Sequence, residues 1–223
     1  FNYIRKIFSK YEKNPKSILE MACGTGNLSY YLAREGYDLT CFDISSDMLS
    51  IAYNKLYEFK NVTILKQDMT DFNLFKKFDC ILSICDSINY IIDEKDLVNT
   101  FKRVREHLKE DGIFIFDINS YYKLKNIIGN NIFVEDREDV FYTWLNNFDE
   151  KENIVEFYLT FFIKDKDGLY RRFDEEHLQK AYTVKEIADF LKEAGFRKID
   201  YFDAFTFIPP KDTSERINFV AFP

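Results

Sequence analysis

Few residues in this sequence interrupt or cross-link a folded chain. The 223 residues include only 7 glycines, 4 prolines, 4 cysteines and 2 histidines. The scarcity of Gly and Pro, together with 46% hydrophobic residues, excludes an extended, disordered protein. A chain of this length buries roughly 70% of its unfolded surface. We therefore expect one domain, with or without a small insert, that needs neither disulfides nor a metal for stability.

The four cysteines form neither a disulfide framework nor a zinc site. None belongs to a C-x-x-C pair, and both histidines are distant from them in sequence. Cys23, Cys41, Cys80 and Cys85 all lie in apolar, strand-like runs. We expect them to be small core residues of a protein in a reducing compartment, and we expect no metal site.

Long apolar runs and positively charged runs are also absent. No stretch of eighteen apolar residues or signal peptide is found, so we expect a cytoplasmic protein that does not bind a membrane. The net charge is -7, whereas nucleic-acid binders usually present a basic face. A small molecule is the expected partner.

The frequent use of Lys, Ile, Asn and Phe is typical of an AT-rich bacterial genome. The sequence begins inside an apparent helix, so we expect further residues upstream.

The first half of the chain alternates predicted strands with predicted helices. The pattern predicts strands over 17–21, 38–42, 62–65, 78–84 and 112–116, and helices over 3–11, 27–35, 46–59 and 94–108. Strand-helix units at this spacing predict a doubly wound parallel sheet.

The second half begins with strands of a different kind. From about 132 to 178 apolar and polar residues alternate, and turn signals lie at 148–153 and at Asp165–Gly168. We expect three antiparallel strands there. A helix from Thr183 to Ala194 and strands over 196–205 and 216–222 follow. The sequence thus predicts an α/β fold in which 1–128 and 181–223 form a seven-stranded mixed sheet with helices on both faces, interrupted by an antiparallel sheet over 129–180.

A glycine-containing turn follows the first predicted strand. Glu20 ends this buried strand, and Ala22-Cys23-Gly24-Thr25-Gly26 lead into a helix. The glycines permit positive φ and let a ligand approach the backbone. Open α/β sheets bind ligands at the carboxyl ends of their strands, so the turn is a candidate ligand site.

Polar side chains also follow the next three strands. Asp43 lies nineteen residues after Gly24, where a carboxylate can accept both hydroxyls of a ribose, although Asp43 could instead cap a helix. Asp68 can hold an adenine amino group and Met69 can cover the ring, although Asp68 could be a simple turn residue. The segment 85–90 leaves the fourth strand at the same edge.

These motifs resemble the class I S-adenosylmethionine-dependent methyltransferases over nearly the whole chain. Ala22 stands where that family usually has its first glycine. The resemblance implies a Rossmann-like fold, S-adenosyl-L-methionine as cofactor and transfer of its methyl group. The implied cofactor-binding residues are Glu20, Ala22, Cys23, Gly24, Thr25, Gly26, Asp43, Ile44, Met48, Asp68, Met69, Cys85, Asp86 and Asn89. By this likeness the glycine turn lines the amino acid part of the cofactor, and Glu20 anchors that turn. The second strand end holds the ribose, the third flanks adenine, and the fourth lies near the sulfonium.

The inserted strands resemble those of aminosugar N-methyltransferases and glycine N-methyltransferase, in which such a sheet roofs the active site. This likeness implies a small-molecule acceptor, such as an amine or aminosugar. Asp86 or His177 could accept a proton from it, and Tyr90, Trp144 and Tyr158 could shape its pocket. The alternatives are a structural histidine and aromatic side chains that only pack.

Other interpretations remain open at this point. RNA or protein could be the methyl acceptor, although the acidic balance disfavours RNA. The chain could also bind the cofactor without catalysis. Gly24-x-Gly26-x-x-Ser29 approximates a dinucleotide fingerprint, but the second nucleotide-binding half of such a fold is missing. Cys85 lacks the adjacent proline of cytosine-5 methyltransferases, and Asp86 lacks the Pro-Pro pair of enzymes that methylate base amino groups.

Overall fold

The structure, a computed structural model, describes residues 1–223 and contains two β-sheets. In chain order the elements are α1 (Asn2–Lys10), β1 (Ser17–Met21), α2 (Asn27–Arg34), β2 (Asp38–Asp43), α3 (Ser46–Leu56), β3 (Val62–Lys66), β4 (Phe78–Ser83), the 3-10 helix η1 (Ser87–Tyr90), α4 (Glu94–His107), β5 (Leu108–Asn119), the π-helix η2 (Lys123–Ile128), β6 (Ile132–Asp136), β7 (Val140–Asp149), β8 (Ile154–Lys164), β9 (Tyr170–Lys180), α5 (Val184–Glu193), β10 (Lys198–Asp203) and β11 (Arg216–Phe222).

The larger sheet, sheet A, has seven strands in the order β10-β11-β5-β4-β1-β2-β3. Strands β1 to β5 are parallel, whereas β11 is antiparallel to both β5 and β10. This confirms the predicted mixed sheet. The winding direction reverses between β1 and β4, which places the loops after these strands around a crevice at the carboxyl edge.

Helices cover both faces of sheet A, as predicted. One buried cluster joins α1, α2 and α3 to the sheet through residues such as Ile7, Leu32 and Ala52. The other joins α4 and α5 to the opposite face through residues such as Phe101 and Leu191. Because both faces are covered, the central strands are apolar almost throughout, and this packing fixes the carboxyl edge rigidly.

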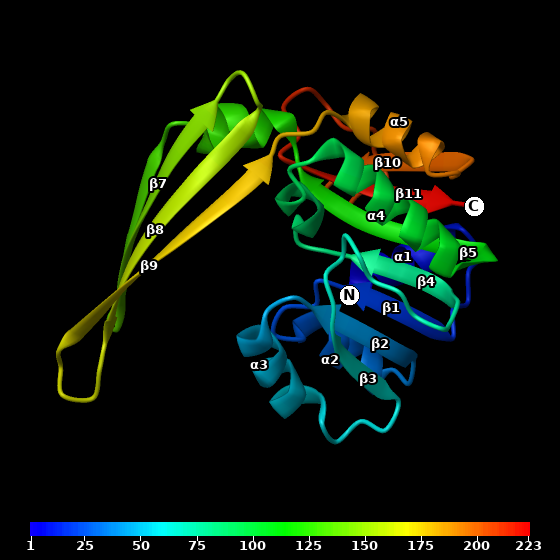
Figure 1. The fold of residues 1–223 in the computed structure, drawn as a ribbon, viewed down its shortest axis with the longest axis horizontal. Helices are drawn as coiled ribbons and strands as arrows, with labels where there is room; N and C mark the ends of the chain where they lie inside the picture. Colours follow the sequence, from blue (N-terminus) through cyan, green and yellow to red (C-terminus); the bar gives the residue numbers. More distant parts are fainter.

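The second sheet, sheet B, has four strands in the order β6-β7-β8-β9, all antiparallel. Figure 1 shows it extending away from sheet A as a long arm. The prediction of three strands was wrong, because β6 pairs with β7 through the charged turn Arg137–Asp139, which carries none of the usual Gly or Asn turn residues. Sheet B lies between β5 and α5 in sequence and is rooted beside the carboxyl edge of sheet A.

The environment of one cysteine also differs from the prediction. Cys23, Cys41 and Cys80 are buried, but Cys85 is exposed. The chain leaves β4 at Ser83, and Cys85 then adopts a left-handed conformation with φ of 66° that turns it out of the sheet. No helix in the structure combines the length and the apolar character needed to cross a bilayer.

Candidate functional site

The turn after β1 has three residues in the left-handed region. Ala22, Gly24 and Gly26 have φ values of 52°, 54° and 73°. The Gly24 N–H donates to one oxygen of Asp43 at 2.8 Å, and the Ser45 N–H donates to the other at 2.9 Å. Ser45, not Asp43, is the N-cap of α3. Asp43 therefore joins the turn after β1 to the loop after β2, and the helix-cap interpretation of Asp43 is wrong.

Glu20 lies beneath this turn rather than in an open cavity. Its side chain is buried and accepts a hydrogen bond from the Ser29 hydroxyl of α2. Burial raises the pKa of Glu20 to about 7, and the bond from Ser29 opposes part of that rise. Glu20 thus ties the end of β1 to the helix that follows the turn.

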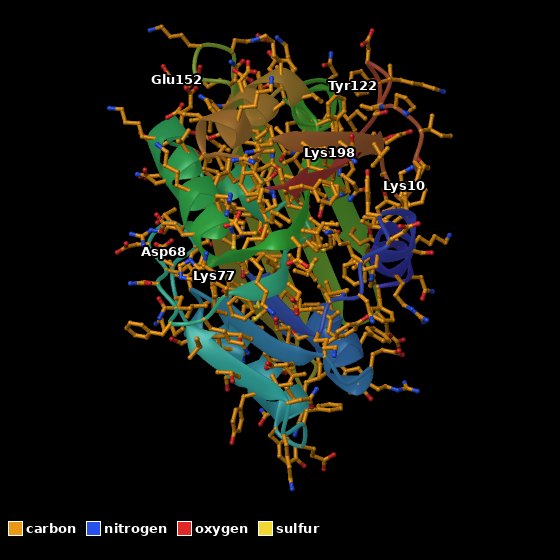
Figure 2. The ribbon with its side chains drawn as sticks, turned by 90° about the vertical axis from the view of Figure 1, so that its right-hand side faces the viewer. Lys10, Asp68, Lys77, Tyr122, Glu152 and Lys198 are labelled. Carbon is orange, nitrogen blue, oxygen red and sulfur yellow. The ribbon has the colours of Figure 1, made fainter.

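A cavity of about 360 Å³ opens at the ends of β2 and β3. Its lining consists of Ala22, Phe42, Asp43, Ile44, Gln67, Asp68, Met69, Thr70, Tyr90, Ile91, Ile92, Asp93 and Asp96. Asp68 and Lys77, labelled in Figure 2, bracket most of the loop between β3 and β4, which is tied to α4 by a bond from Arg103 to the Phe72 carbonyl. The lining of the cavity thus combines apolar side chains with the carboxylates of Asp43, Asp68, Asp93 and Asp96.

This cavity, which we call the adenosine cavity, fits the nucleoside part of the implied cofactor. Asp43 and Asp68 lie in one cavity together with Met69, as the sequence interpretation requires. Asp68 also accepts bonds from the backbone and hydroxyl of Thr70, so it shapes a turn as well. No atom lies within 4 Å of the position that a Gly24 Cβ would occupy, which leaves the backbone open to the amino acid part of a ligand.

The other predicted cofactor residues are placed less uniformly. Ala22 and Ile44 line the adenosine cavity, whereas Cys23, Thr25 and Met48 do not. Asn89 is fully buried. Its side-chain amide donates to the carbonyl oxygens of Asn119 and Lys180, and its side-chain oxygen accepts from the Asn119 N–H. The side chain of Asn89 thus fastens the root of sheet B to β5 and does not line the adenosine cavity.

A second cavity, of about 500 Å³, lies between sheet B and the carboxyl edge of sheet A. We call it the sheet B cavity. It is lined by Asp86, Tyr90, Asn119, Lys123, Ile128, Tyr142, Trp144, Phe157, Leu159, Phe161, His177, Gln179 and Arg216. Tyr90 lines both cavities, so the two are neighbours.

Three of the four residues predicted for the acceptor side, besides Tyr90, line this second cavity. Asp86, Trp144 and His177 do so, but Tyr158 does not. Side chains alternate along β8, so Phe157 and Leu159 face the cavity while Tyr158 points to the opposite face, where it is 42% exposed and bonds Glu156. The assignment of Tyr158 is therefore wrong.

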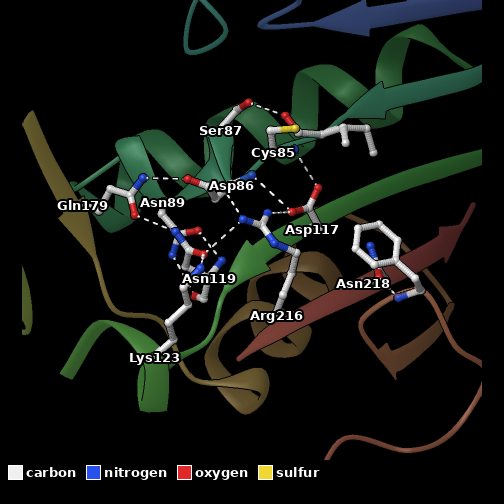
Figure 3. A network of polar contacts seen from close by, with 12 residues as sticks. Cys85, Asp86, Ser87, Asn89, Asp117, Asn119, Lys123, Gln179, Arg216 and Asn218 are labelled. Carbon is white, nitrogen blue, oxygen red and sulfur yellow. Dashed lines mark hydrogen bonds and ion pairs between the residues drawn. The ribbon is translucent and has the colours of Figure 1, made fainter. Parts of the chain in front are cut away.

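A polar network forms the floor of the sheet B cavity (Figure 3). Arg216 donates to Asp117 and, at 2.6 Å, to Asp86. Asp117 also accepts the backbone N–H groups of Cys85 and Asp86, both of which have positive φ. Burial raises the pKa of Asp117, and the charge of Arg216 opposes that rise. The second oxygen of Asp86 accepts from Gln179 of β9 at 2.8 Å.

Most residues of this polar network were not predicted from the sequence. The residues are separated by up to a hundred positions in sequence, and β5, η2, β9 and β11 bring them together: Asp117, Asn119, Lys123, Gln179 and Arg216. The available clue was a charged side chain inside the apolar end of β5 and another at the start of β11. A charge in an otherwise buried strand needs a partner, which predicts a pair without naming it.

The two glycines of the turn are expected to respond differently to Ala. Gly24→Ala should cost about 1 kcal/mol of stability through its positive φ, but weaken S-adenosylhomocysteine binding more than tenfold, because only a ligand would meet the new Cβ. Gly26→Ala should mainly destabilise, by roughly 1–3 kcal/mol, because its Cβ would lie 3.1 Å from that of Ala52. Urea unfolding and calorimetry separate these effects. Wild-type affinity in Gly24→Ala would contradict this.

The fold and the first cavity define a Rossmann-like protein that binds an adenosine-containing cofactor. Comparison with known proteins identifies the cofactor. A family model described as a methyltransferase domain matches residues 18–112. A protein of Geobacillus sp. (strain WCH70) named "Putative methyltransferase" is 40% identical over 99% of this chain and 90% of its own length.

A solved structure and a further relative agree. A S-adenosylmethionine-dependent methyltransferase from Clostridium acetobutylicum superposes with a TM-score of 0.92 at 38% identity, over 99% of this chain and 89% of that one. A Streptomyces venezuelae relative, dTDP-3-amino-3,4,6-trideoxy-alpha-D-glucopyranose N,N-dimethyltransferase, is 31% identical over 45% of this chain and 41% of its own. The chain belongs to the S-adenosylmethionine-dependent methyltransferase family.

Proposed function

We propose that this methyltransferase acts on a small molecule with an amino group, held in the sheet B cavity under a cap formed by residues 129–180. The observation that carries the proposal is the pair of neighbouring cavities with Tyr90 between them. A molecule in the second cavity would lie beside a cofactor in the first. The size of the second cavity, about 500 Å³, suits a small molecule rather than a nucleic acid or a protein surface.

The chemistry asks little of the protein beyond alignment. The bound cofactor supplies an activated methyl group on its sulfonium. The chain must hold an acceptor in line with it and keep water out. Trp144, Phe157 and Phe161 provide an apolar wall on the sheet B side. Such aromatic faces pack against a small ring and attract a partly charged amine.

We assign His177 as the group that accepts the proton from the amine. It lines the cavity, its ring meets Tyr90 edge-on at 5.9 Å, and its Nε2 lies 3.3 Å from a Glu175 oxygen. Asp86 suits proton removal less well, because Arg216 and Gln179 occupy both of its oxygens. We therefore assign Asp86 as a positioning residue that orients the floor of the cavity.

Two further facts support an amine acceptor and disfavour RNA. The Streptomyces venezuelae relative that matches 45% of the chain is named as a dimethyltransferase of an aminosugar. The net charge of -7 opposes binding to a polyanion. Non-catalytic binding of the cofactor has no specific observation in its favour.

A release assay for S-adenosylhomocysteine tests the proposal. The acceptors are amines, amino acids and aminosugars, with bulk tRNA and unfolded protein as competing classes. We expect turnover with a small amine. Methyl incorporation only into tRNA or protein would reject the proposed acceptor class.

His177→Ala should lower kcat about 100-fold, the scale of general base catalysis, while cofactor affinity stays within twofold of wild type. Glu176→Ala is the matched control, because this neighbouring side chain lies on the other face of β9. Steady-state kinetics across pH 6–9 give the comparison. Equal kcat in His177→Ala and wild type would remove His177 from the reaction.

A further inference from the structure

Two cations stand at one end of the sheet B cavity. Lys123 of η2 and Arg216 of β11 line this cavity and also a third one, of about 510 Å³, on its far side. Tyr90 and His177 are absent from the third cavity, so they mark the opposite, cofactor-facing end of the sheet B cavity. The acceptor cavity therefore has a cationic end and an end where methyl transfer would occur.

Arg216 is neutralised within the protein, whereas Lys123 is not. Arg216 forms ion pairs with both Asp86 and Asp117. Lys123 forms no ion pair, and the only acceptor for its ammonium group is the Asn119 side-chain oxygen at 3.0 Å. An ammonium has three donors, so two remain for a ligand.

The surroundings of Lys123 make its charge costly. It is half-buried, and this burial, followed by the nearby charge of Arg216, lowers its pKa. Asp86, Glu215 and Asp117 offset the shift only in part. A buried ammonium without a paired anion is unfavourable, so an anion that arrives with a ligand recovers part of that free energy.

The third cavity is built for a polar occupant. It contains only two apolar residues, and its lining is Lys123, Asp203, Ala204, Phe205, Lys211, Thr213, Ser214, Glu215 and Arg216. Arg216 is already paired with Asp86 and Asp117. Of the other charged groups, Lys123 and Lys211 equal Asp203 and Glu215 in number, but neither lysine forms an ion pair. An anionic group at the junction would thus meet two ammonium groups that no carboxylate pairs.

We propose that the acceptor carries an oxyanion, a carboxylate or a phosphate, that binds Lys123 where the sheet B cavity meets the third cavity. This inference rests on the proposed function and narrows its substrate class to small molecules with an amine at one end and an oxyanion at the other. The oxyanion binds Lys123. This contact places the amine of the same molecule at the other end of the cavity, which is lined by Tyr90 and His177. Lys123 is then a specificity residue that makes no contact with the methyl group.

The first experiment measures anion binding without any acceptor. Protein loaded with S-adenosylhomocysteine is titrated with inorganic phosphate and, separately, with acetate, and binding is followed by NMR chemical shifts. We expect saturable binding of at least one anion, weakened about tenfold or more in Lys123→Gln, the scale of one charge-assisted hydrogen bond. Which of the two binds more tightly separates phosphate from carboxylate.

Matched variants make the result specific. Lys123→Arg keeps the charge and should keep binding. Lys60→Gln removes an exposed lysine on the α3–β3 turn and should bind as wild type does. Equal anion affinity in Lys123→Gln and wild type, or no saturable binding of either anion, would overturn the inference.

The second experiment uses matched acceptors in the release assay: ethanolamine against serine, and glucosamine against glucosamine 6-phosphate. We expect the anionic member of at least one pair to be preferred, and Lys123→Gln to raise its KM about 10- to 100-fold with kcat nearly unchanged. If wild type methylates the neutral and anionic members of both pairs equally well, and Lys123→Gln leaves the KM of the anionic members unchanged, the oxyanion inference fails and the amine proposal stands. If phosphate or acetate binds at Lys123 but no amine is methylated, the amine proposal fails instead.

Discussion

Asp43→Ala is expected to weaken S-adenosylhomocysteine binding by about 3 kcal/mol, or roughly 100-fold. Two losses add together. The carboxylate lines the adenosine cavity, where it can accept from ribose hydroxyls. It also accepts the Gly24 N–H, so its removal frees the turn that carries the amino acid end of the cofactor.

Calorimetry with S-adenosylhomocysteine measures the effect, and two variants help to interpret it. Asp167→Ala removes a carboxylate at the tip of the β8–β9 hairpin and should bind the cofactor product normally. Asp43→Asn keeps the shape and loses the charge, so its affinity should fall between wild type and Asp43→Ala. Wild-type binding by Asp43→Ala would reject Asp43 as a cofactor ligand.

Arg216→Ala should destabilise the protein by about 3 kcal/mol at neutral pH, because it leaves the carboxylate of Asp117 buried without its ion-pair partner. The side chain of Asp117 is only 2% exposed, so water cannot replace the guanidinium. The turn at Cys85 and Asp86 also loses support, because Asp117 holds both of its N–H groups.

The loss should depend on pH. Arg216 lowers the pKa of Asp117 against the effect of burial, so its removal raises that pKa further. The folded variant then binds a proton that the unfolded chain releases, and its stability rises as the pH falls through this window. We expect the deficit relative to wild type to shrink between pH 7.5 and pH 5.5.

Urea unfolding at both pH values checks this prediction. Arg171→Ala is the control, because this arginine is 82% exposed and lies 3.6 Å from Asp165, so its loss should cost less than about 0.5 kcal/mol. A deficit in Arg216→Ala that is the same at both pH values would show that Asp117 is not the source of the instability.

Local patterns were sufficient to predict most of the fold. The bounds of β1 and β11 match the predicted ranges, and α5 begins with the Thr183 cap as expected. The errors in the predicted strands occurred where the local sequence carries no recognisable turn or strand signal. The β6–β7 turn is charged instead of Gly-rich, and β5 begins at Leu108, four residues before the glycine at which the strand was predicted to start.

The cofactor side of the site was more predictable than the acceptor side. Asp43, Asp68 and Met69 each follow a parallel strand, and parallel strands end at a common edge, so their convergence follows from the fold. No comparable rule predicts which side chains of sheet B converge on the acceptor cavity. Period two separates Phe157 from Tyr158, but only the packing of the arm shows which face meets the core. Arg216 and Asp117 pair across the β5–β11 register, which no local pattern contains.

The two main cavities share a single lining residue, Tyr90. The other residues that line the adenosine cavity fall within 22–96, and those that line the sheet B cavity, apart from Asp86, fall within 119–216. Most mutations that reshape one cavity therefore fall in a different stretch of the gene from those that reshape the other. Under selection, such an arrangement lets a lineage exchange its acceptor while its dependence on one cofactor is inherited unchanged.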